Sequence, residues 1–443
     1  MNIVRPSDST YEQTLREIVE ASSLFDSEVE ERTRKIVQQV ADHGDAALLE
    51  LTQRFDGAAL SADQLQVSAA ERMTAALTTD EDFRQALELA SNNIRAFSRR
   101  SRRRNWSSKN AQGATVGEKF DPFQRVGLYI PGGTAPLAST ALMTILLAQT
   151  AGCREIVVCT PCGRDGSINP ALLHAVTASG ATEIYKVGGA QAIAAMAQGT
   201  ATIRKVNKVF GPGNAYVVAA KRLLVGHVAI DLLPGPSEVL VIADQTANPQ
   251  WIAADLLAQA EHGSGHERVW LVTPHGPLCK AVEKEIRRQL PKLSRRDFAE
   301  RALFANGWLI QTRTLEEAVS LTNRLAPEHC EIMTRRPHEV AEKVVTAGAI
   351  FMGGYSPTVL GDYVAGPSHT LPTGGAGASF AGLTVDQFQR RTSLVEYNRT
   401  ALQKSLRAVA TFARMEGLDA HGRSAAIRLE TSAKSKSRKS NRR

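Results

Sequence analysis

The sequence predicts an α/β protein with two Rossmann-like parallel sheets and small helical extensions at its amino- and carboxyl-terminal ends. From residue 124 onwards, short β-like runs alternate with stretches long enough to form a helix. The runs are apolar without strict alternation, which is typical of parallel strands covered by helices on both faces. Aromatic residues make up only 5% of the chain and hydrophobic residues 43%, a balance that suits layered α/β packing.

The expected strands are the apolar runs of this second part of the chain. They are VGLYI from residue 126, EIVVCT from 155, EIYKV from 183, KVF from 208, HVAID from 227, EVLVIAD from 238, RVWLVT from 268, WLIQT from 308, EIMT from 331 and AIFMG from 349. So many strands exceed one comfortable sheet. Pro234, Gly235 and Pro236 precede the run at 238, so we expect one α/β domain over 125–238 and the other over 239–380.

The remaining segments have helical patterns. We assign 1–24 to an amino-terminal extension and 25–124 to the helical part of the domain that 239–380 completes. After Gly361 a Gly-rich loop is followed by expected helices over TVDQFQRRTS and ALQKSLRAVATFARMEG, which define a helical segment at 381–430. Residues 431–443 contain no acid and many Lys, Arg and Ser residues, so we expect a disordered basic tail.

The net charge of +8 is local. Six cations follow Ala433 and five arginines lie in the run from Arg99 to Arg104. These positive charges together exceed the net charge of the whole chain, so the rest of the chain is close to neutral. A nucleic-acid-binding protein usually carries its basic residues on the folded domain itself. We therefore do not expect nucleic-acid binding to be the main function.

Three features indicate a cytoplasmic protein. Prolines and glycines interrupt the uncharged stretch 126–153, and its apolar part is shorter than the roughly 20 residues of a membrane-spanning helix. The amino terminus lacks the apolar run of a secretory signal. Five cysteines are an odd number, which favours free thiols in a reducing compartment. Cys159 and Cys162 have redox spacing, but the next helix is expected only near Pro170, so a redox role is not favoured.

Two short segments in the middle of the chain carry residues suited to chemistry. Gln259 and His262 are three residues apart and are expected on one helix face near its carboxyl end. Glu328 and His329 are adjacent just before an expected strand, where a carboxyl group and an imidazole can transfer protons. Each pair alone is also typical of an ordinary polar surface.

Two further segments lie nearer the carboxyl terminus. Asp362 and His369 belong to a loop rich in Gly and Pro, and such loops often line active sites. Glu416 and His421 follow an expected helix. Oxygen and nitrogen ligands from widely separated segments suit a catalytic zinc ion better than a structural one.

The glycine-rich loops do not predict a nucleotide. GPGNAYV, GGAQAIAAMA and IPGGTAP all depart from the dinucleotide fingerprint, and no GxxxxGK[ST] phosphate loop is found in the sequence. Motifs alone therefore leave the cofactor open.

Taken in order, these segments resemble the histidinol dehydrogenase family. The matching strings are VGLYIPGGTAPL, STALM, VGGAQAIAAMA, GPGNAYV, AAK, AID..PGPSEVLVIAD, ADLLAQAEHG, NRLAPEH, GDYVAG..H.LPT and EGLDAH, in the family's order from about residue 125 to 425. The resemblance implies oxidation of L-histidinol through histidinal to L-histidine, in two NAD-dependent steps of histidine biosynthesis. It also implies a homodimer with one zinc ion per subunit.

The resemblance also implies roles for individual residues. The zinc ligands would be Gln259, His262, Asp362 and His421, and Glu328 and His329 would be the acid–base residues. Ser237, His369 and Glu416 would help to hold the substrate beside the zinc ligands and His329. Tyr129, Gln191 and Asn214 would contact NAD on the 125–238 domain. The segment 381–430 would form the dimer and carry Glu416 and His421 into the neighbouring subunit's site.

Some positions depart from the family's pattern. Pro234, Ser368 and Cys330 replace the usual Ala, Asn and Leu, and the run 98–105 is unusually basic. A related zinc- and NAD-dependent dehydrogenase acting on another small alcohol, such as a dihydroxysulfonate, is therefore one alternative. A catalytically silent binding protein is a second, and the full set of ligands and acid–base residues argues against it. A cysteine that traps the aldehyde is not favoured, because Cys153 begins an expected buried strand.

Overall fold

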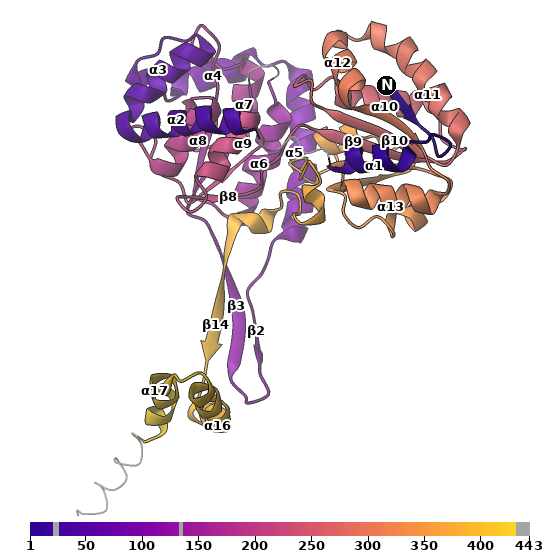
Figure 1. The fold of residues 1–443 in the computed structure, drawn as a ribbon. Coiled ribbons are helices and arrows are strands. Elements are labelled where there is room, and N and C mark those ends of the chain that lie inside the picture. Colours follow the sequence, from indigo (N-terminus) through magenta and orange to yellow (C-terminus); the bar gives the residue numbers. More distant parts are fainter. Residues whose placement is uncertain (21–25, 133–135, 431–443) are drawn as a thin grey trace, which may run out of the picture. The chain divides into compact units, whose positions relative to one another are not determined.

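The computed structural model describes residues 1–20, 26–132 and 136–430, and it divides into two compact units (Figure 1). Unit 1 comprises Met1–Arg102 and Phe123–Phe388, and unit 2 comprises Arg103–Pro122 and Gln389–Arg443. The expected basic tail at 431–443 lies outside the described residues. Each unit is described by itself below.

The first sheet of unit 1 is parallel throughout, in the order β1-β11-β10-β9-β12-β13. Its strands are β1 (Asn2–Val4), β9 (Glu238–Ala243), β10 (Arg268–Thr273), β11 (Gly307–Gln311), β12 (His329–Met333) and β13 (Ala349–Met352). One face is covered by α10 (Pro249–Ala260), α11 (Gly276–Gln289) and α12 (Arg296–Asn306), and the other by α1 (Tyr11–Glu20), α13 (Leu315–Leu325) and α14 (Pro337–Ala341) (Figure 1). Along β9, Val239 and Val241 enter one core while Leu240 and Ile242 enter the other. The strand is apolar without alternation because both faces are buried.

The second sheet of unit 1 is also parallel, in the order β6-β5-β4-β7-β8. Its strands are β4 (Arg125–Tyr129), β5 (Glu155–Thr160), β6 (Glu183–Lys186), β7 (Lys208–Phe210) and β8 (Ala229–Ile230). Apolar residues of α6 (Ala138–Ala151) and α7 (Pro170–Ala178) form one core, and those of α8 (Gly189–Gln198) and α9 (Ala215–Leu223) form the other. The expected α/β class with two parallel sheets is thus confirmed.

The amino-terminal helices differ from the expected grouping. They are α2 (Ser27–His43), α3 (Asp45–Asp56), α4 (Ala69–Thr78) and α5 (Glu81–Ser101). Val40 and Leu48 are buried in the core with α8 and α9, and Ala75 and Ile94 in the core with α6 and α7. These helices therefore cover the sheet of 125–238 and not, as assigned from the sequence, that of 239–380. Helical periodicity identifies an apolar face but not the sheet that will bury it.

Residues 1–20 are integrated into the first sheet instead of extending from it. β1 pairs with β11, and Tyr11 and Leu15 of α1 are buried in a core of that sheet. The remaining short elements of unit 1 are α15 (Thr358–Tyr363) and the 3-10 turns at Ala62–Gln64, Leu290–Lys292, Ala376–Ala378 and Val385–Phe388.

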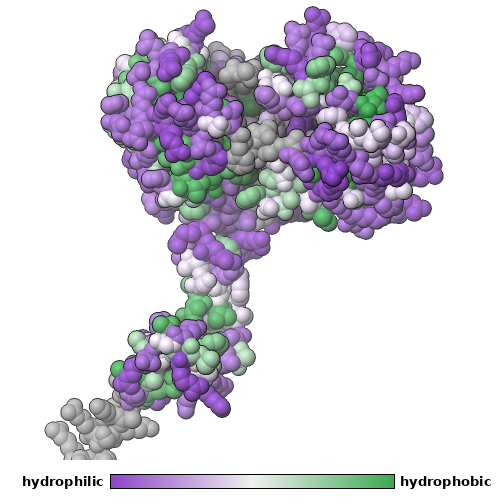
Figure 2. All heavy atoms as spheres, in the orientation of Figure 1, coloured by the Kyte–Doolittle hydropathy of each residue, from purple (hydrophilic) through white to green (hydrophobic). Residues whose placement is uncertain are grey.

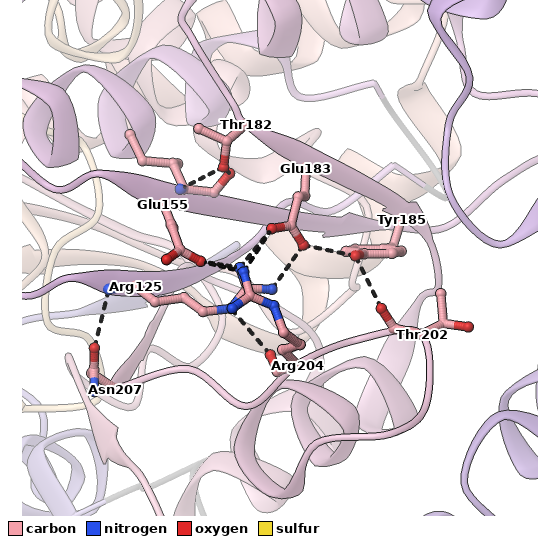
Figure 3. Close-up of polar contacts among 9 residues, drawn as sticks. Arg125, Glu155, Thr182, Glu183, Tyr185, Thr202, Arg204 and Asn207 are labelled. Atoms are coloured by element: carbon pink, nitrogen blue, oxygen red, sulfur yellow. Dashed lines mark hydrogen bonds and ion pairs between the residues drawn. The ribbon is translucent and has the colours of Figure 1, made fainter.

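An ionic network closes the amino edge of the second sheet (Figure 3). Arg125, Glu155 and Glu183 are the first residues of three adjacent strands. Arg125 Nη1 donates to Glu155 Oε2 and to Glu183 Oε1, both at 2.6 Å, and Nη2 donates to Glu183 Oε2 at 2.7 Å. Tyr185 donates to the same carboxylate at 2.7 Å. The hydrogen bonds from Arg125 hold the pKa of Glu183 down at about 2. This edge is occupied by structural charges, so a ligand of this sheet is expected at the opposite, carboxyl edge.

Unit 2 contains an antiparallel sheet in the order β14-β3-β2, with bounds β2 (Trp106–Lys109), β3 (Thr115–Pro122) and β14 (Gln389–Glu396). It also contains α16 (Arg399–Met415) and α17 (Asp419–Glu430). The expected helix over TVDQFQRRTS is wrong, because this segment forms a 3-10 turn followed by β14. The expectation that 25–124 is helical is also wrong for β2 and β3. These strands are largely exposed and polar, so they lack the apolar runs that mark strands elsewhere in the chain.

The uncharged stretch 126–153 forms most of β4 and the buried helix α6, as expected. Among the described residues, no helix is both long and apolar enough to cross a membrane.

Candidate active site

Glu328 and His329 lie where α13 turns into β12 at the amino edge of the first sheet. The turn is made at Ala326, which has a φ of 45° and is the non-glycine residue with positive φ among those described. Such a backbone costs about 1–3 kcal/mol and is typical of functional sites. Both side chains are buried, with residue exposures of 5% and 4%.

The main chain of Glu238 holds both residues of this pair. Its N–H donates to Glu328 Oε2 at 2.7 Å, and its carbonyl oxygen lies 2.9 Å from His329 Nδ1. Because a carbonyl only accepts, His329 Nδ1 carries the proton and Nε2 presents a lone pair. The fold therefore sets the tautomer that a general base needs.

Burial gives the pair unusual proton affinities. It raises the pKa of Glu328 well above the ordinary value, and the charges of Glu238 and Asp362 act in the same direction. Burial also lowers the pKa of His329, although the charge of Asp362 opposes this effect. Perturbed acid and imidazole groups side by side are typical of a proton-transfer site.

Asp362 and His369 approach the pair from α15 and the loop after it. Asp362 Oδ1 lies 3.8 Å from His329 Nε2. His369 Nδ1 donates to the carbonyl oxygen of Asp362 at 3.0 Å, and its Nε2 lies 3.2 Å from Thr140 Oγ1 of α6. Since α6 follows the carboxyl end of β4, this contact joins the amino edge of the first sheet to the carboxyl edge of the second.

Gln259 and His262 lie at the end of α10. Gln259 is 3% exposed, and its Nε2 atom is buried without a hydrogen-bond partner among the described residues. The helix ends at Ala260, so His262 lies just beyond it on a turn and not, as expected, on a shared helix face. His262 is one of the groups that, after burial, lower the pKa values of His329 and His369. His262 therefore lies close enough to His329 and His369 to affect their protonation.

The chemistry of these residues fits a zinc ion. The unpaired amide of Gln259 costs free energy, so a partner for it is favoured. Rotation of the side-chain amide by 180° exchanges its oxygen and nitrogen, so Gln259 could supply a ligand oxygen. With one imidazole and one carboxylate, unit 1 offers three donors of the kinds that zinc binds. No group of three His, Cys, Asp or Glu side chains suited to a metal is found in 1–20, 26–132 and 136–430. The fourth expected ligand, His421, lies on α17 of unit 2.

The other expected substrate residues are in two places. Ser237 directly precedes β9, and its carbonyl oxygen accepts from Arg268 N at 3.1 Å. Glu416 is the C-cap of α16 in unit 2. Glu416 and His421 therefore belong to unit 2, and the other expected site residues belong to unit 1.

The three residues expected to contact NAD gather at the carboxyl edge of the second sheet. Tyr129 ends β4 and accepts a hydrogen bond from Gly189 N at 3.1 Å, and Gln191 lies in the first turn of α8. Asn214 caps α9 by accepting from Tyr216 N and Val217 N, both at 3.1 Å. The chain runs outward from β4 to β6 and then returns to β7 on the other side of β4. Nucleotides bind at such a switch point in open α/β sheets.

Sequence reasoning missed the buried ion pair that supports this edge. Lys221 and Asp231 form an ion pair with both side chains fully buried. Lys221 Nζ also donates to the carbonyl oxygen of Gly211 at 3.0 Å, and Gly211 N donates to Asp231 Oδ2 at 2.8 Å. Gly211 has a φ of 111°, and a Cβ there would lie 2.1 Å from Tyr129 O, so only glycine fits. Spacing in the sequence could not show that these residues meet.

The cysteines do not contribute a nucleophile. The five cysteines are free, as expected, and all five are buried. Burial raises the pKa of Cys153 to about 12, and a thiol with that pKa is almost wholly protonated at neutral pH.

Two parallel sheets, with a buried carboxyl–imidazole pair held by the main chain at the edge of the first, define this chain as an α/β enzyme. The histidinol dehydrogenase family model matches residues 19–429, and the chain belongs to that family of oxidoreductases. It is 47% identical over 421 residues to a histidinol dehydrogenase of Geobacillus kaustophilus (94% of this chain, 99% of the relative) and 48% identical over 402 residues to one of a Synechococcus strain (91% and 92%). The crystal structure of histidinol dehydrogenase from Elizabethkingia anophelis superposes with a TM-score of 0.92 at 34% identity, covering 98% of this chain and 99% of that one. The family expected from the sequence is confirmed.

Proposed function

We propose that this protein oxidises L-histidinol through histidinal to L-histidine, using two NAD per histidine, as an enzyme of histidine biosynthesis. The observation that carries the proposal is the buried Glu328–His329 pair clamped by Glu238, in a chain of the histidinol dehydrogenase family. Neither alternative considered from the sequence, a dihydroxysulfonate dehydrogenase or a silent binding protein, is favoured by the family match.

His329 is the proposed general base in both oxidation steps. Its Nδ1–H is held by the Glu238 carbonyl oxygen, so Nε2 is the atom that takes the hydroxyl proton. NAD, when bound, supplies the hydride acceptor. Because burial favours the neutral imidazole, His329 is ready to accept a proton at neutral pH.

Glu328 is the proposed base for the water that attacks the aldehyde. Burial raises its pKa, so its carboxylate, once formed, is a stronger base than an exposed one. The hydrogen bond from Glu238 N fixes Oε2, which directs the carboxyl group within the site. After hydration, and after His329 has released the first proton to solvent, the neutral imidazole serves again as base for the second oxidation.

We assign Gln259, His262, Asp362 and His421 as ligands of one zinc ion per subunit. Zinc, when bound, would fix the orientation of the substrate. We further assign Ser237, His369 and Glu416 to substrate binding and Tyr129, Gln191 and Asn214 to NAD binding. The first set lies near the proton-transfer pair or on unit 2, and the second lies at the switch point of the second sheet.

We propose that the protein acts as a homodimer in the cytoplasm, with unit 2 of one chain completing the site of the other. Unit 1 contributes three of the four proposed zinc ligands, so the fourth must come from a unit 2. Unit 2 exposes large apolar side chains (Figure 2), among them Val395, Phe412 and Met415 at 69%, 67% and 76%. Exposed apolar groups of this size are typical of a surface that another chain covers.

Steady-state reduction of NAD with L-histidinol, with and without a chelator, tests the proposed function. We expect two NAD reduced per histidinol consumed and loss of activity on chelation that added zinc restores. Turnover of a dihydroxysulfonate without turnover of histidinol would instead establish the related dehydrogenase. Absence of activity with both substrates, together with absence of bound metal, would favour the silent binding protein.

A further inference from the structure

Two buried carboxyl groups that the proposed chemistry does not use lie next to the site. Asp255 is on α10 and Glu331 is on β12, with exposures of 8% and 1%. Their side chains are hydrogen-bonded to each other. Buried acids away from a cation are rare because a buried charge is costly.

A hydrogen bond between these two groups requires one shared proton. A carboxylate only accepts, so two carboxyl groups can form a hydrogen bond only if one of them is protonated. Glu331 Oε1 accepts from Thr358 N at 2.8 Å, whereas Oε2 has no donor among the described residues. Oε2 is therefore the oxygen of Glu331 available to share a proton with Asp255. In agreement, burial raises the pKa of Glu331 well above its ordinary value and that of Asp255 to about 6.

The hydrogen-bonded chain Asp255–Glu331–Thr358 joins the three elements that carry the chemistry of unit 1. α10 carries Asp255 one turn before Gln259. β12 carries Glu331 two residues after His329. Thr358 is the first residue of α15, the helix of six residues that also carries Asp362. Such a short helix has little stability of its own, so its direction depends on how its first turn is held.

We propose that Asp255 and Glu331 are positioning residues, whose carboxyl–carboxyl hydrogen bond fixes α10 and α15 against β12. The linkage sets the arrangement around His329 of the three residues Gln259, His262 and Asp362. The inference rests on the proposed function in one respect, namely that these three residues bind the metal. The linkage itself is a property of the protein without metal, so it can be tested separately.

Hydrogen exchange of the metal-free protein tests the linkage. Glu331→Gln keeps it, because the amide NH2 donates to Asp255 while the amide oxygen accepts from Thr358 N. Glu331→Ala removes both bonds. We expect the alanine variant to speed exchange in peptides covering 358–363 and 249–262 about tenfold or more, and the glutamine variant to stay within about threefold of wild type. Asp255→Asn and Asp255→Ala form a second matched pair, which decides the matter if Glu331→Ala does not fold.

Zinc affinity, measured by competition with a chromophoric chelator in the absence of substrate, tests the consequence for the site. We expect Glu331→Ala to weaken zinc binding about tenfold or more, in the range usual for groups that orient ligands, and Glu331→Gln to change it little. Glu183→Gln is the control, because it weakens a buried network at the amino edge of the other sheet. It should lower thermal stability without changing zinc affinity or exchange at 358–363.

The outcomes separate this proposal from the proposed function. If Glu331→Ala and Asp255→Ala match Glu183→Gln in exchange and in zinc affinity, the positioning role is refuted. Equal loss in the alanine and glutamine variants would also refute it, because the hydrogen bond would not be the cause. If wild-type protein binds no zinc or does not oxidise histidinol, the proposed function fails, while the exchange data still decide whether the linkage exists.

Discussion

Replacing Lys221 with methionine tests whether the buried ion pair supports the nucleotide edge of the second sheet. The change removes the ammonium group from a side chain that is fully buried with Asp231 and that also donates to Gly211 O. Methionine retains most of the apolar stem, so the main loss is electrostatic. Asp231 would keep its bond from Gly211 N but would remain as a buried carboxylate without its ion-pair partner.

The expected loss is large because neither group can reach water. Removing one partner of a buried ion pair typically costs about 3–5 kcal/mol. For a chain of 443 residues, an unfolding entropy of about 2.1 cal/mol/K per residue corresponds to about 0.9 kcal/mol/K. The melting temperature should therefore fall by about 3–5 °C. Since Lys221 also holds the turn at Gly211, we expect the KM for NAD to rise about tenfold, the effect of one lost hydrogen bond.

Scanning calorimetry and initial-rate kinetics at varied NAD measure both effects. The matched control is the double variant Lys221→Met/Asp231→Asn, which has no charge in this position but keeps an acceptor for Gly211 N. It should recover at least half of the lost stability. A melting temperature within 1 °C of wild type for the single variant, or a double variant no more stable than the single one, would show that the reasoning is wrong.

Three further predictions concern the site and the amino edge. Glu328→Gln should slow oxidation of histidinal more than that of histidinol, by about 10²–10⁴-fold; equal losses in single-turnover measurements with each substrate would contradict its role in water activation. His262→Ala should abolish zinc retention after gel filtration, measured by elemental analysis. The control His275→Ala, on the loop before α11, should retain zinc. Zinc retained by His262→Ala would remove His262 from the ligand set. Glu183, whose pKa falls from 4.5 to about 2 on folding, should contribute about 3 kcal/mol of stability above pH 4.5. Because the pKa is depressed in the folded state, this contribution is lost as the pH falls from about 4.5 towards 2. The difference in melting temperature between wild type and Glu183→Gln should therefore shrink over that range. A constant difference would refute the stabilising role of the Glu183 carboxylate.

The site owes its properties to the joining of two sheet edges with different roles. The amino edge of the first sheet supplies the proton-transfer pair, because α13 turns at Ala326 directly into β12. The carboxyl edge of the second sheet supplies the switch point, and Thr140 of α6 contacts His369 from that side. In Rossmann-type sheets the ligand is usually sought at carboxyl edges alone. Here an amino edge contributes the acid and the base.

Some features were predictable because their causes are local. Ten of the eleven parallel strands described were identified from apolar runs such as 238–244, since a strand buried on both faces is apolar at most positions. The short β1 was not among them. The pairs Glu328–His329 and Gln259–His262 were identified from residue type and spacing. Family membership followed from motif order and is confirmed by the family model. The roles of the individual site residues stay predictions.

The sequence by itself therefore determined the α/β class, all the strands of both parallel sheets except β1, and the residue types available for chemistry. Only the tertiary structure decided that α2–α5 cover the second sheet, that 115–122 pairs with 389–396, and that Glu238 clamps the acid–base pair. These features depend on contacts between residues far apart in the chain, and polar strands such as β3 and β14 carry no local pattern that identifies their partner. Burial and the shared carboxyl proton of Asp255 and Glu331 likewise arise only when α10, β12 and α15 pack together, because a carboxyl group keeps its ordinary pKa until folding removes it from water.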